Sequence, residues 1–118
     1  MPTLAAPRER VLPFLLQLQR EGQALLELPV TNHEELAAFG AAKSAWAHLA
    51  HRGLMRAFVD DGTPSWPAYQ FLHGSDGLFV QLDDLAELVS QVVYSRGVLG
   101  FQLGVLAVAI AEVERATT

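Results

Sequence analysis

Apolar residues recur at three- and four-residue steps over the first part of the chain, which is the spacing of one face of an α-helix. Pro7 suits the first turn of a helix, and Pro29 closes the pattern. The spacing therefore predicts an N-terminal helical segment over residues 7–28, with Gly22 as a point where it can break in two. The apolar positions are Val11, Leu12, Phe14, Leu15, Leu18, Ala24, Leu25 and Leu28.

Two shorter helices are expected next, separated by a tight turn. Thr31 or Asn32 can cap the first of them, because their side-chain oxygens can accept hydrogen bonds from the free amides of the first turn. This helix is expected to stop at Gly40. The next helix starts near Ala41 and ends at Gly53, since glycine is favoured just after a helix end.

The sequence changes character after the third predicted helix. Residues 54–59 and 66–72 are short, apolar or aromatic runs, and a cluster of turn residues at 60–64 lies between them. Two short strands joined by a turn make a hairpin. Residues 78–82 are a third strand or an extended lead into the next helix.

Two further helices are expected toward the C-terminus. Asp83 and Asp84 suit the start of the first, because carboxylates are favoured near a helix N-terminus. In the second, residues 97–111 contain Gln102 as their only polar side chain, and the helix extends to about Arg115. A membrane-spanning helix needs about 20 apolar residues. We therefore expect a buried core or interface helix rather than a membrane span.

These elements predict a single domain over residues 1–118 that is mainly α with a small β-hairpin. A helix, a tight turn, a second helix and a hairpin form the layout of a winged helix-turn-helix. The expected parts are an N-terminal helical segment at 7–28, the helix-turn-helix and hairpin at 31–80, and C-terminal helices at 83–115. The N- and C-terminal helices are expected to pack as a dimer interface.

Three short motifs carry a resemblance to a known family. They are Glu35-Leu-Ala-Ala-Phe-Gly, Leu49-Ala-His-Arg-Gly-Leu-Met and Pro67-Ala-Tyr-Gln-Phe. The first two are similar to motifs of winged-helix families. The third, with Arg52-Gly-Leu-Met-Arg-Ala-Phe-Val before it and Gly77 and Leu85 after it, resembles a pattern of small bacterial helix-turn-helix proteins, antitoxin-like relatives of the Xre-type antitoxins that pair with RES-domain toxins. The resemblance covers residues 31–88. It implies a DNA-binding regulator or antitoxin-like protein, with a toxin as a candidate protein partner.

The distribution of charge also favours an anionic partner. Residues 36–59 contain no carboxylate, although the whole chain has a formal net charge of −5. Cations that contact DNA phosphates release bound counterions, so such binding weakens as salt rises. With a helix around residues 41–52 lying on DNA, the predicted DNA-binding residues are Lys43, Ser44, His48, Arg52 and Arg56.

A protein-interaction module on a degenerate winged-helix fold is the alternative function. Nucleic-acid-binding domains tend to be basic, whereas this chain has a pI of about 5.2. In this interpretation the partner-binding residues are Trp66, Tyr69 and Gln70 of the aromatic hairpin, together with the apolar C-terminal helix. A homodimer is expected in either case. Its predicted interface residues are Gly100, Gly104, Ala107 and Ala111, which would let a second helix approach closely.

Catalysis and cofactor binding are not expected. The chain has no cysteine, which excludes thiol nucleophiles and cysteine zinc sites and fits a reducing, cytoplasmic setting. His48 and His51 could share one helix face, but a third metal ligand at a matching spacing is missing. We therefore expect no enzyme activity, no cofactor and no metal site.

Overall fold

The structure is a computed structural model that describes residues 3–60, 62–63, 66–73 and 88–115 of the chain. These residues form an all-α protein. Its four helices are α1 (Arg8–Leu26), α2 (His33–Ala57), α3 (Pro67–His73) and α4 (Leu88–Arg115).

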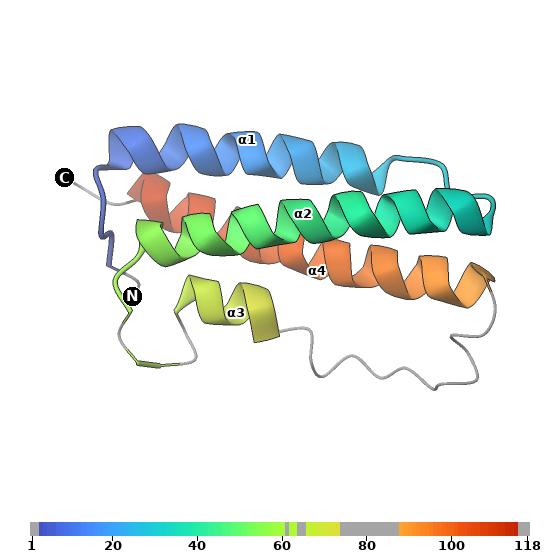
Figure 1. Ribbon diagram of the computed structural model, residues 1–118. Coiled ribbons are helices and arrows are strands. Elements are labelled where there is room, and N and C mark those ends of the chain that lie inside the picture. Colours follow the sequence, from blue (N-terminus) through green and yellow to red (C-terminus); the bar gives the residue numbers. More distant parts are fainter. Residues whose placement is uncertain (1–2, 61, 64–65, 74–87, 116–118) are drawn as a thin grey trace.

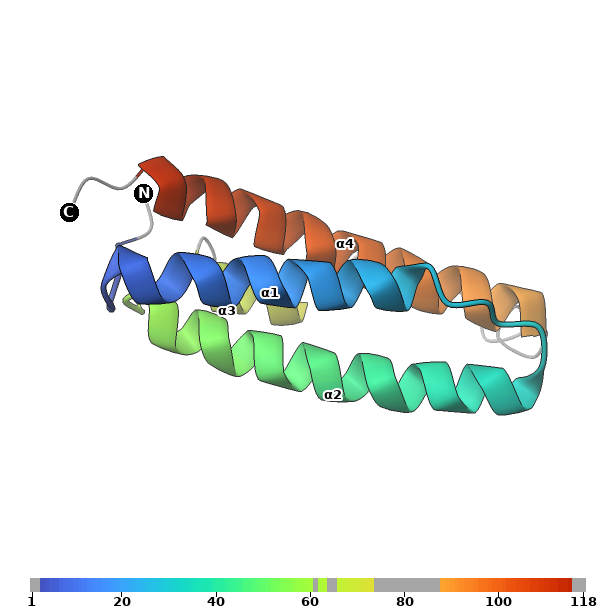
Figure 2. The same cartoon turned by 90° about the horizontal axis from the view of Figure 1, so that it is seen from above.

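Three long helices and one short helix form a bundle (Figure 1). Helix α1 runs antiparallel to α2 and α4 and packs against both (Figures 1 and 2). The short α3 lies between α2 and α4, on the side opposite α1, and also contacts both. The described residues begin and end at the same end of the bundle, where α1 begins and α4 finishes (Figure 1).

The core lies where the four helices meet. Each helix contributes side chains that are almost completely buried, at positions that repeat with the helical period. Burying a large apolar side chain of this kind stabilises the fold by about 1.5–3 kcal/mol. The largest fully buried side chains are Phe58, Phe71, Leu15, Leu18, Leu54, Leu99, Leu106 and Val113.

The predicted helix-turn-helix is wrong, because α2 is one continuous helix of 25 residues. It begins after Asn32, whose side-chain oxygen accepts a 2.7 Å hydrogen bond from the backbone amide of Glu35. Gly40 lies inside the helix and is exposed. A glycine costs a helix about 1 kcal/mol relative to alanine. The buried residues Phe39, Trp46 and Ala50 continue one apolar stripe across Gly40, and their packing outweighs that cost.

The predicted hairpin is also wrong: no strand occurs in the described residues. The first expected strand is mostly the last turn of α2, because Leu54 and Ala57 extend the buried stripe of that helix. The second is α3, which begins at Pro67, a favoured first helical residue. The expected third strand at 78–82 and the helix start at Asp83 and Asp84 lie outside the described residues.

Extended pairing in the described residues is limited to an isolated antiparallel bridge between Leu4 and Phe58. The backbone amide of Ala5 donates to the carbonyl oxygen of Ala57 at 2.8 Å, and the amide of Val59 donates to that of Thr3 at 2.7 Å. The end of the first expected strand therefore holds residues 3–7, called the N-terminal arm, against the bundle.

The two terminal helices are unbroken. Helix α1 continues through Gly22, and α4 continues through Gly97, where a separate apolar helix was expected to begin. The N-terminal segment predicted at 7–28 thus agrees closely with α1. Helix α4 ends at Arg115, as predicted.

Candidate functional site

The five predicted DNA-binding residues do not share one face of α2. Lys43 is half-buried, and loss of water around its ammonium group lowers the pKa of this lysine. Successive helical residues are about 100° apart around the axis. Ser44 therefore points well away from Lys43 and is exposed. Lys43 belongs to the inner side of the helix and does not extend the outer basic face.

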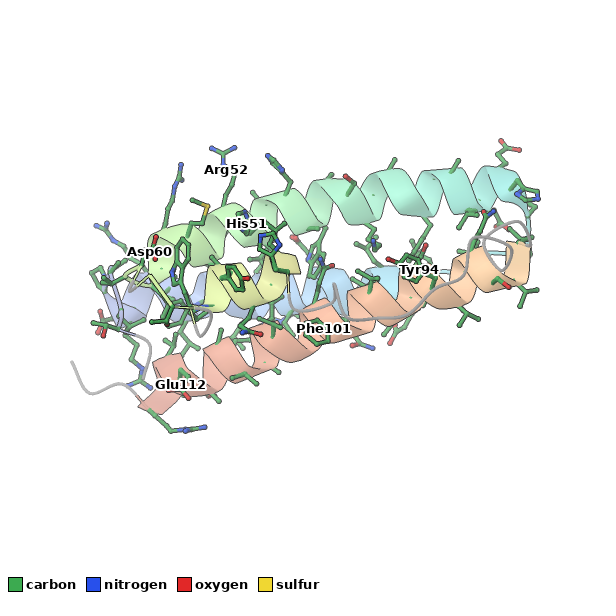
Figure 3. All side chains as sticks on the ribbon, turned by 90° about the horizontal axis from the view of Figure 1, so that it is seen from below. His51, Arg52, Asp60, Tyr94, Phe101 and Glu112 are labelled. Atoms are coloured by element: carbon green, nitrogen blue, oxygen red, sulfur yellow. The ribbon has the colours of Figure 1, made fainter. Side chains whose placement is uncertain are left out.

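The other four residues are exposed along the outer side of α2. Ser44, His48, Arg52 and Arg56 follow at four-residue steps, so each is displaced by about 40° from the one before. This drift carries Arg56 toward α1. Figure 3 shows Arg52 pointing away from the bundle and its neighbour His51 pointing toward α3. Arg52 and Arg56 therefore lie nearer to α1 than Ser44 and His48 do.

His51 lies on the flank of α2 that faces α3 (Figure 3), close enough to His48 and His73 to feel their charges. The pKa of His51 is lowered, chiefly because burial penalises the charged ring and in part because His48 and His73 repel its charge. His73 also stacks at a tilt against Tyr69 in α3, with 4.8 Å between the ring centroids. At neutral pH this flank favours a neutral His51 over a cation that could contact phosphate.

A groove of about 360 Å³ lies between α1 and α2. Three arginines line it: Arg10 comes from α1, while Arg52 and Arg56 come from α2. Sequence reasoning found the two α2 residues but missed Arg10, because no local pattern links this residue to α2. The remaining lining residues are Ala6, Val11, Phe14, Leu49, Gly53 and Ala57.

The predicted partner-binding residues diverge in the structure. Trp66 is half-buried, and its indole Nε1 donates a 3.3 Å hydrogen bond to the carbonyl oxygen of Phe58. Tyr69 is 43 % exposed. Gln70 instead lines a second groove, of about 570 Å³, between α3 and α4. Trp66 thus closes the turn region, and Tyr69 and Gln70 belong to different surfaces.

The predicted dimer-interface residues lie together on one face of α4. Gly100, Gly104 and Ala107 are exposed, and Ala111 is half-buried. The same face continues to Gly97 and Val93, which are also exposed. We call these residues the α4 small-residue face: Val93, Gly97, Gly100, Gly104, Ala107 and Ala111.

The spacing of this face matches a helix-pairing seam. Its six members follow one another at alternating steps of four and three residues. This is the heptad pattern of the seam between two paired helices. The buried side chains of α4, including Leu99, Leu106 and Val113, occupy the opposite side. The seam is therefore additional to the stripe that holds α4 in its own bundle.

The three glycines of this face have no role in internal packing. A Cβ atom built on Gly97, Gly100 or Gly104 would have no neighbouring heavy atom within 4 Å. Two exposed valines lie beside the small residues: Val89 is 72 % exposed and Val108 is 63 % exposed. The face is apolar and exposed, and it borders grooves at Gly104.

Metal-ligand chemistry has little support in the described part of the chain. No group of three or more His, Asp or Glu residues there could hold a metal ion. The carboxylate of Asp60 accepts a 2.8 Å hydrogen bond from the backbone amide of Gly62 and so closes a turn. Asp83 and Asp84 lie outside the described residues.

Helix α4 is the one described helix that is long and apolar enough to cross a membrane. Within the most apolar 18-residue stretch of this helix, 39 % is buried inside the bundle. Length and composition are weak evidence here, because the core helices of soluble proteins meet the same criterion.

Comparison with known proteins returns no match: no family model, no curated protein and no solved structure matches the chain. The resemblance to antitoxin-like proteins therefore stays a prediction from short motifs.

Proposed function

We propose that this protein is a non-enzymatic helical interaction module that forms a homodimer through the α4 small-residue face. The observation that carries the proposal is the exposure of three interior glycines of α4 along a heptad seam, with no internal neighbour to explain them. Each interior glycine costs a helix about 1 kcal/mol relative to alanine. A second helix could pack more closely on the seam because these glycines have no side chains.

Small residues favour close pairing because they let two helix backbones approach. Dispersion attraction then acts between many atom pairs along the whole seam. From Val93 to Ala111 the face extends for about 27 Å, at about 1.5 Å per residue. Stable interfaces bury about 800 Å² of each partner. The exposed valines and Phe101, which lies on the same side of α4 as α3 (Figure 3), would add area at the edges of the seam.

The charge distribution supports self-association at this face in a chain of net charge −5. Arg96 is the one charged residue between Leu88 and Ala111. Its guanidinium Nη2 donates a 2.6 Å hydrogen bond to the carbonyl oxygen of Leu28, which turns the side chain toward the end of α1. The α4 residues of the seam therefore bring no like charges together, and the charged residues beside Gly104 and Ala107 are Arg20 and Glu27 of α1, which have opposite signs.

A twofold axis would give each copy the same contacts, as in most homodimers. In that arrangement Gly100 and Gly104 lie near the middle of the seam, where packing is tightest. Helices from an unrelated partner could use the same face. We commit to a second copy because the seam is uncharged and repeats regularly, so it complements itself.

The DNA-binding interpretation is not carried forward as the proposal. A helix-turn-helix places the N-terminal residues of a short recognition helix against base edges. Lys43 and Ser44 lie instead in the middle of α2, and Lys43 is half-buried. DNA binding remains an outcome that the experiments below can detect.

Sedimentation equilibrium tests the proposal directly. We expect a dimer in the micromolar range for the natural chain and a monomer for Gly104→Leu, because a bulky side chain blocks close approach. Gly40→Leu is the matched control, since Gly40 is an exposed, interior helical glycine with no atom within 4 Å of a Cβ. A natural chain that stays monomeric at about 200 µM, or a Gly104→Leu dimer of unchanged affinity, would contradict the proposal.

A further inference from the structure

The groove between α1 and α2 combines an apolar floor with a basic rim. Val11, Gly53 and Ala57 are buried and form its base. Phe14 and Leu49 line it and remain 40 % and 49 % exposed. Two large apolar side chains are therefore held open to solvent in a hollow.

Three cations surround these apolar side chains. Arg10, Arg52 and Arg56 are all exposed, and no Asp or Glu lines the groove. In the described residues the guanidinium groups of these three arginines have no carboxylate within ion-pair distance, whereas Arg115 pairs with Glu112 at 3.5 Å. Like charges held close together repel each other, and an anionic occupant would relieve that repulsion.

We infer that this groove is a docking site for an acidic amphipathic helix of a partner protein. The three arginines favour an occupant with negative charge. The exposed Phe14 and Leu49 favour an occupant with an apolar side. An occupant must therefore offer apolar side chains flanked by carboxylates. Arginine pairs well with carboxylates because its planar fork of donors matches their two oxygens.

The chemistry of the groove disfavours other anions. Protein–DNA interfaces are strongly polar and positively charged, so a duplex would leave the apolar floor exposed. A free phosphate likewise has no apolar part. Both walls are helices whose backbone groups already pair internally, so an extended peptide finds no free strand edge to join. A helix laid into an apolar groove is the recognition mode that fits these two helical walls and the apolar floor.

This docking site is separate from the α4 small-residue face. Its lining residues come from α1, α2 and the N-terminal arm, and none comes from α4. The inference therefore does not rest on homodimer formation. The sedimentation test of the homodimer and the peptide-binding test of the groove can therefore give opposite results.

Selection from a display library of random 16-residue peptides tests the inference. The natural chain is the bait, and the double variant Arg52→Glu with Arg56→Glu is the counter-selection bait. We expect the enriched peptides to carry Asp or Glu beside apolar residues at helical three- and four-residue spacing. No enrichment, or enrichment without acidic residues, would overturn the inference.

The affinity of the best selected peptide then locates the site. By fluorescence anisotropy we expect the arginine double variant to bind at least tenfold more weakly, and Leu49→Ser to weaken binding severalfold. Arg20→Glu is the matched control because Arg20 is an exposed arginine of α1 that does not line this groove. We expect its affinity to stay within twofold. Arg52→Glu alone carries the same change of charge as Arg20→Glu, so equal losses for these two single variants would indicate a general charge effect and overturn the site.

Three further probes separate the alternatives. A polyglutamate peptide of equal charge, a 20-base-pair DNA duplex and vesicles of anionic phospholipid are titrated under the same conditions. We expect each to bind at least tenfold more weakly than the selected peptide. If the duplex, the vesicles or polyglutamate binds as tightly, the groove is a nonspecific anion surface and the inference fails. Circular dichroism of every variant verifies that it is folded.

Discussion

The indole Nε1 of Trp46 donates a 2.8 Å hydrogen bond to the backbone carbonyl oxygen of Leu18, joining the middle of α2 to the middle of α1. Both residues are buried. A buried indole N–H needs a partner, since leaving it unpaired costs about 1–3 kcal/mol. The ring reaches this carbonyl because Gly22, one turn further along α1, has no side chain in its way.

Gly22→Ala is therefore expected to destabilise the protein, although alanine is the better helix former. The new Cβ would lie 2.5 Å from Cζ2 of Trp46 and 2.7 Å from Cδ2 of Leu103. Overpacking of this kind costs about 1–3 kcal/mol. Gly40→Ala is the matched control and should stabilise by up to about 1 kcal/mol, because its Cβ meets nothing. Urea unfolding measures both, and a stabilised Gly22→Ala variant would contradict the packing of Trp46.

Gly53 and Phe14 provide a second close contact, in the groove between α1 and α2 that Arg10, Arg52 and Arg56 line, called the arginine groove from here on. A Cβ on Gly53 would overlap Cε1 of Phe14. Phe14 is 40 % exposed, so its ring can move outward. We expect Gly53→Ala to cost about 1 kcal/mol in the natural chain and to become neutral or stabilising when Phe14 is also alanine. A double-mutant cycle by urea unfolding measures the difference, and additive effects would show that the two residues do not interact.

The start of α2 depends on a cap. The side chain of Asn32 accepts from the amide of Glu35, and one carboxylate oxygen of Glu35 accepts from both the amide and the hydroxyl of Thr31. Replacing an N-cap asparagine by alanine costs about 1 kcal/mol. Thermal unfolding of Asn32→Ala should show this loss. Asn32→Asp should retain most of the stability, and an equal loss for both variants would argue against the cap.

Acid should weaken this cap through Glu35. The hydroxyl of Thr31, followed by its backbone amide, lowers the pKa of the Glu35 carboxyl below its ordinary value. The stabilisation is therefore fully present above about pH 4.5 and is lost as pH falls through the lowered pKa of the folded state. Thr31→Val removes the principal cause, so NMR titration of the Glu35 carboxyl should give a higher pKa in that variant. An unchanged titration would contradict the hydrogen bond.

Stability should also fall on mild acidification because of His51. Burial, followed by the charges of His48 and His73, lowers its pKa in the folded state. The unfolded chain then binds the proton more readily. Stability is therefore greatest above about pH 6.5 and decreases as pH falls from there to the lowered pKa. Urea unfolding between pH 7.5 and 5 measures the slope, which should become shallower in His51→Gln. An unchanged slope would exclude His51 as its source.

Long helices with clear apolar periodicity could be predicted from the sequence. Whether a glycine ends such a helix or lies inside it could not. The expected segment at 7–28 agrees with α1 because its buried stripe is regular. Gly40 and Gly53 were interpreted as helix ends, yet both lie inside α2. A local cost of about 1 kcal/mol per glycine is smaller than the gain from burying Trp46 and Leu54. Only tertiary contacts reveal that balance.

The candidate surfaces divide in the same way. Gly100 and Gly104 stand out in the sequence because of their four-residue spacing, and the structure places both on an exposed face of α4. Only part of the arginine groove could be predicted from the sequence. Arg52 and Arg56 are one helical turn apart, whereas Arg10 joins them only because α1 packs antiparallel to α2. No sequence pattern within one helix could indicate that the three arginines lie close together.

The α4 glycines permit one further prediction, in which stability and association change in opposite directions. Changing Gly97, Gly100 and Gly104 together to alanine should raise the stability of an isolated monomer by about 2–3 kcal/mol, because alanine is the better helix former. The added methyl groups also hold a second helix further away, so the dimer should dissociate at least tenfold more readily.

Urea unfolding at about 1 µM and at about 100 µM separates these two effects, because dimer formation makes stability depend on concentration. The natural chain should gain stability between the two concentrations, and the triple variant should gain much less. A triple variant that is more stable at both concentrations by the same amount would mean that the glycines serve no interface. The α4 small-residue face would then be ordinary solvent-exposed surface, and the arginine groove would remain as the candidate binding site.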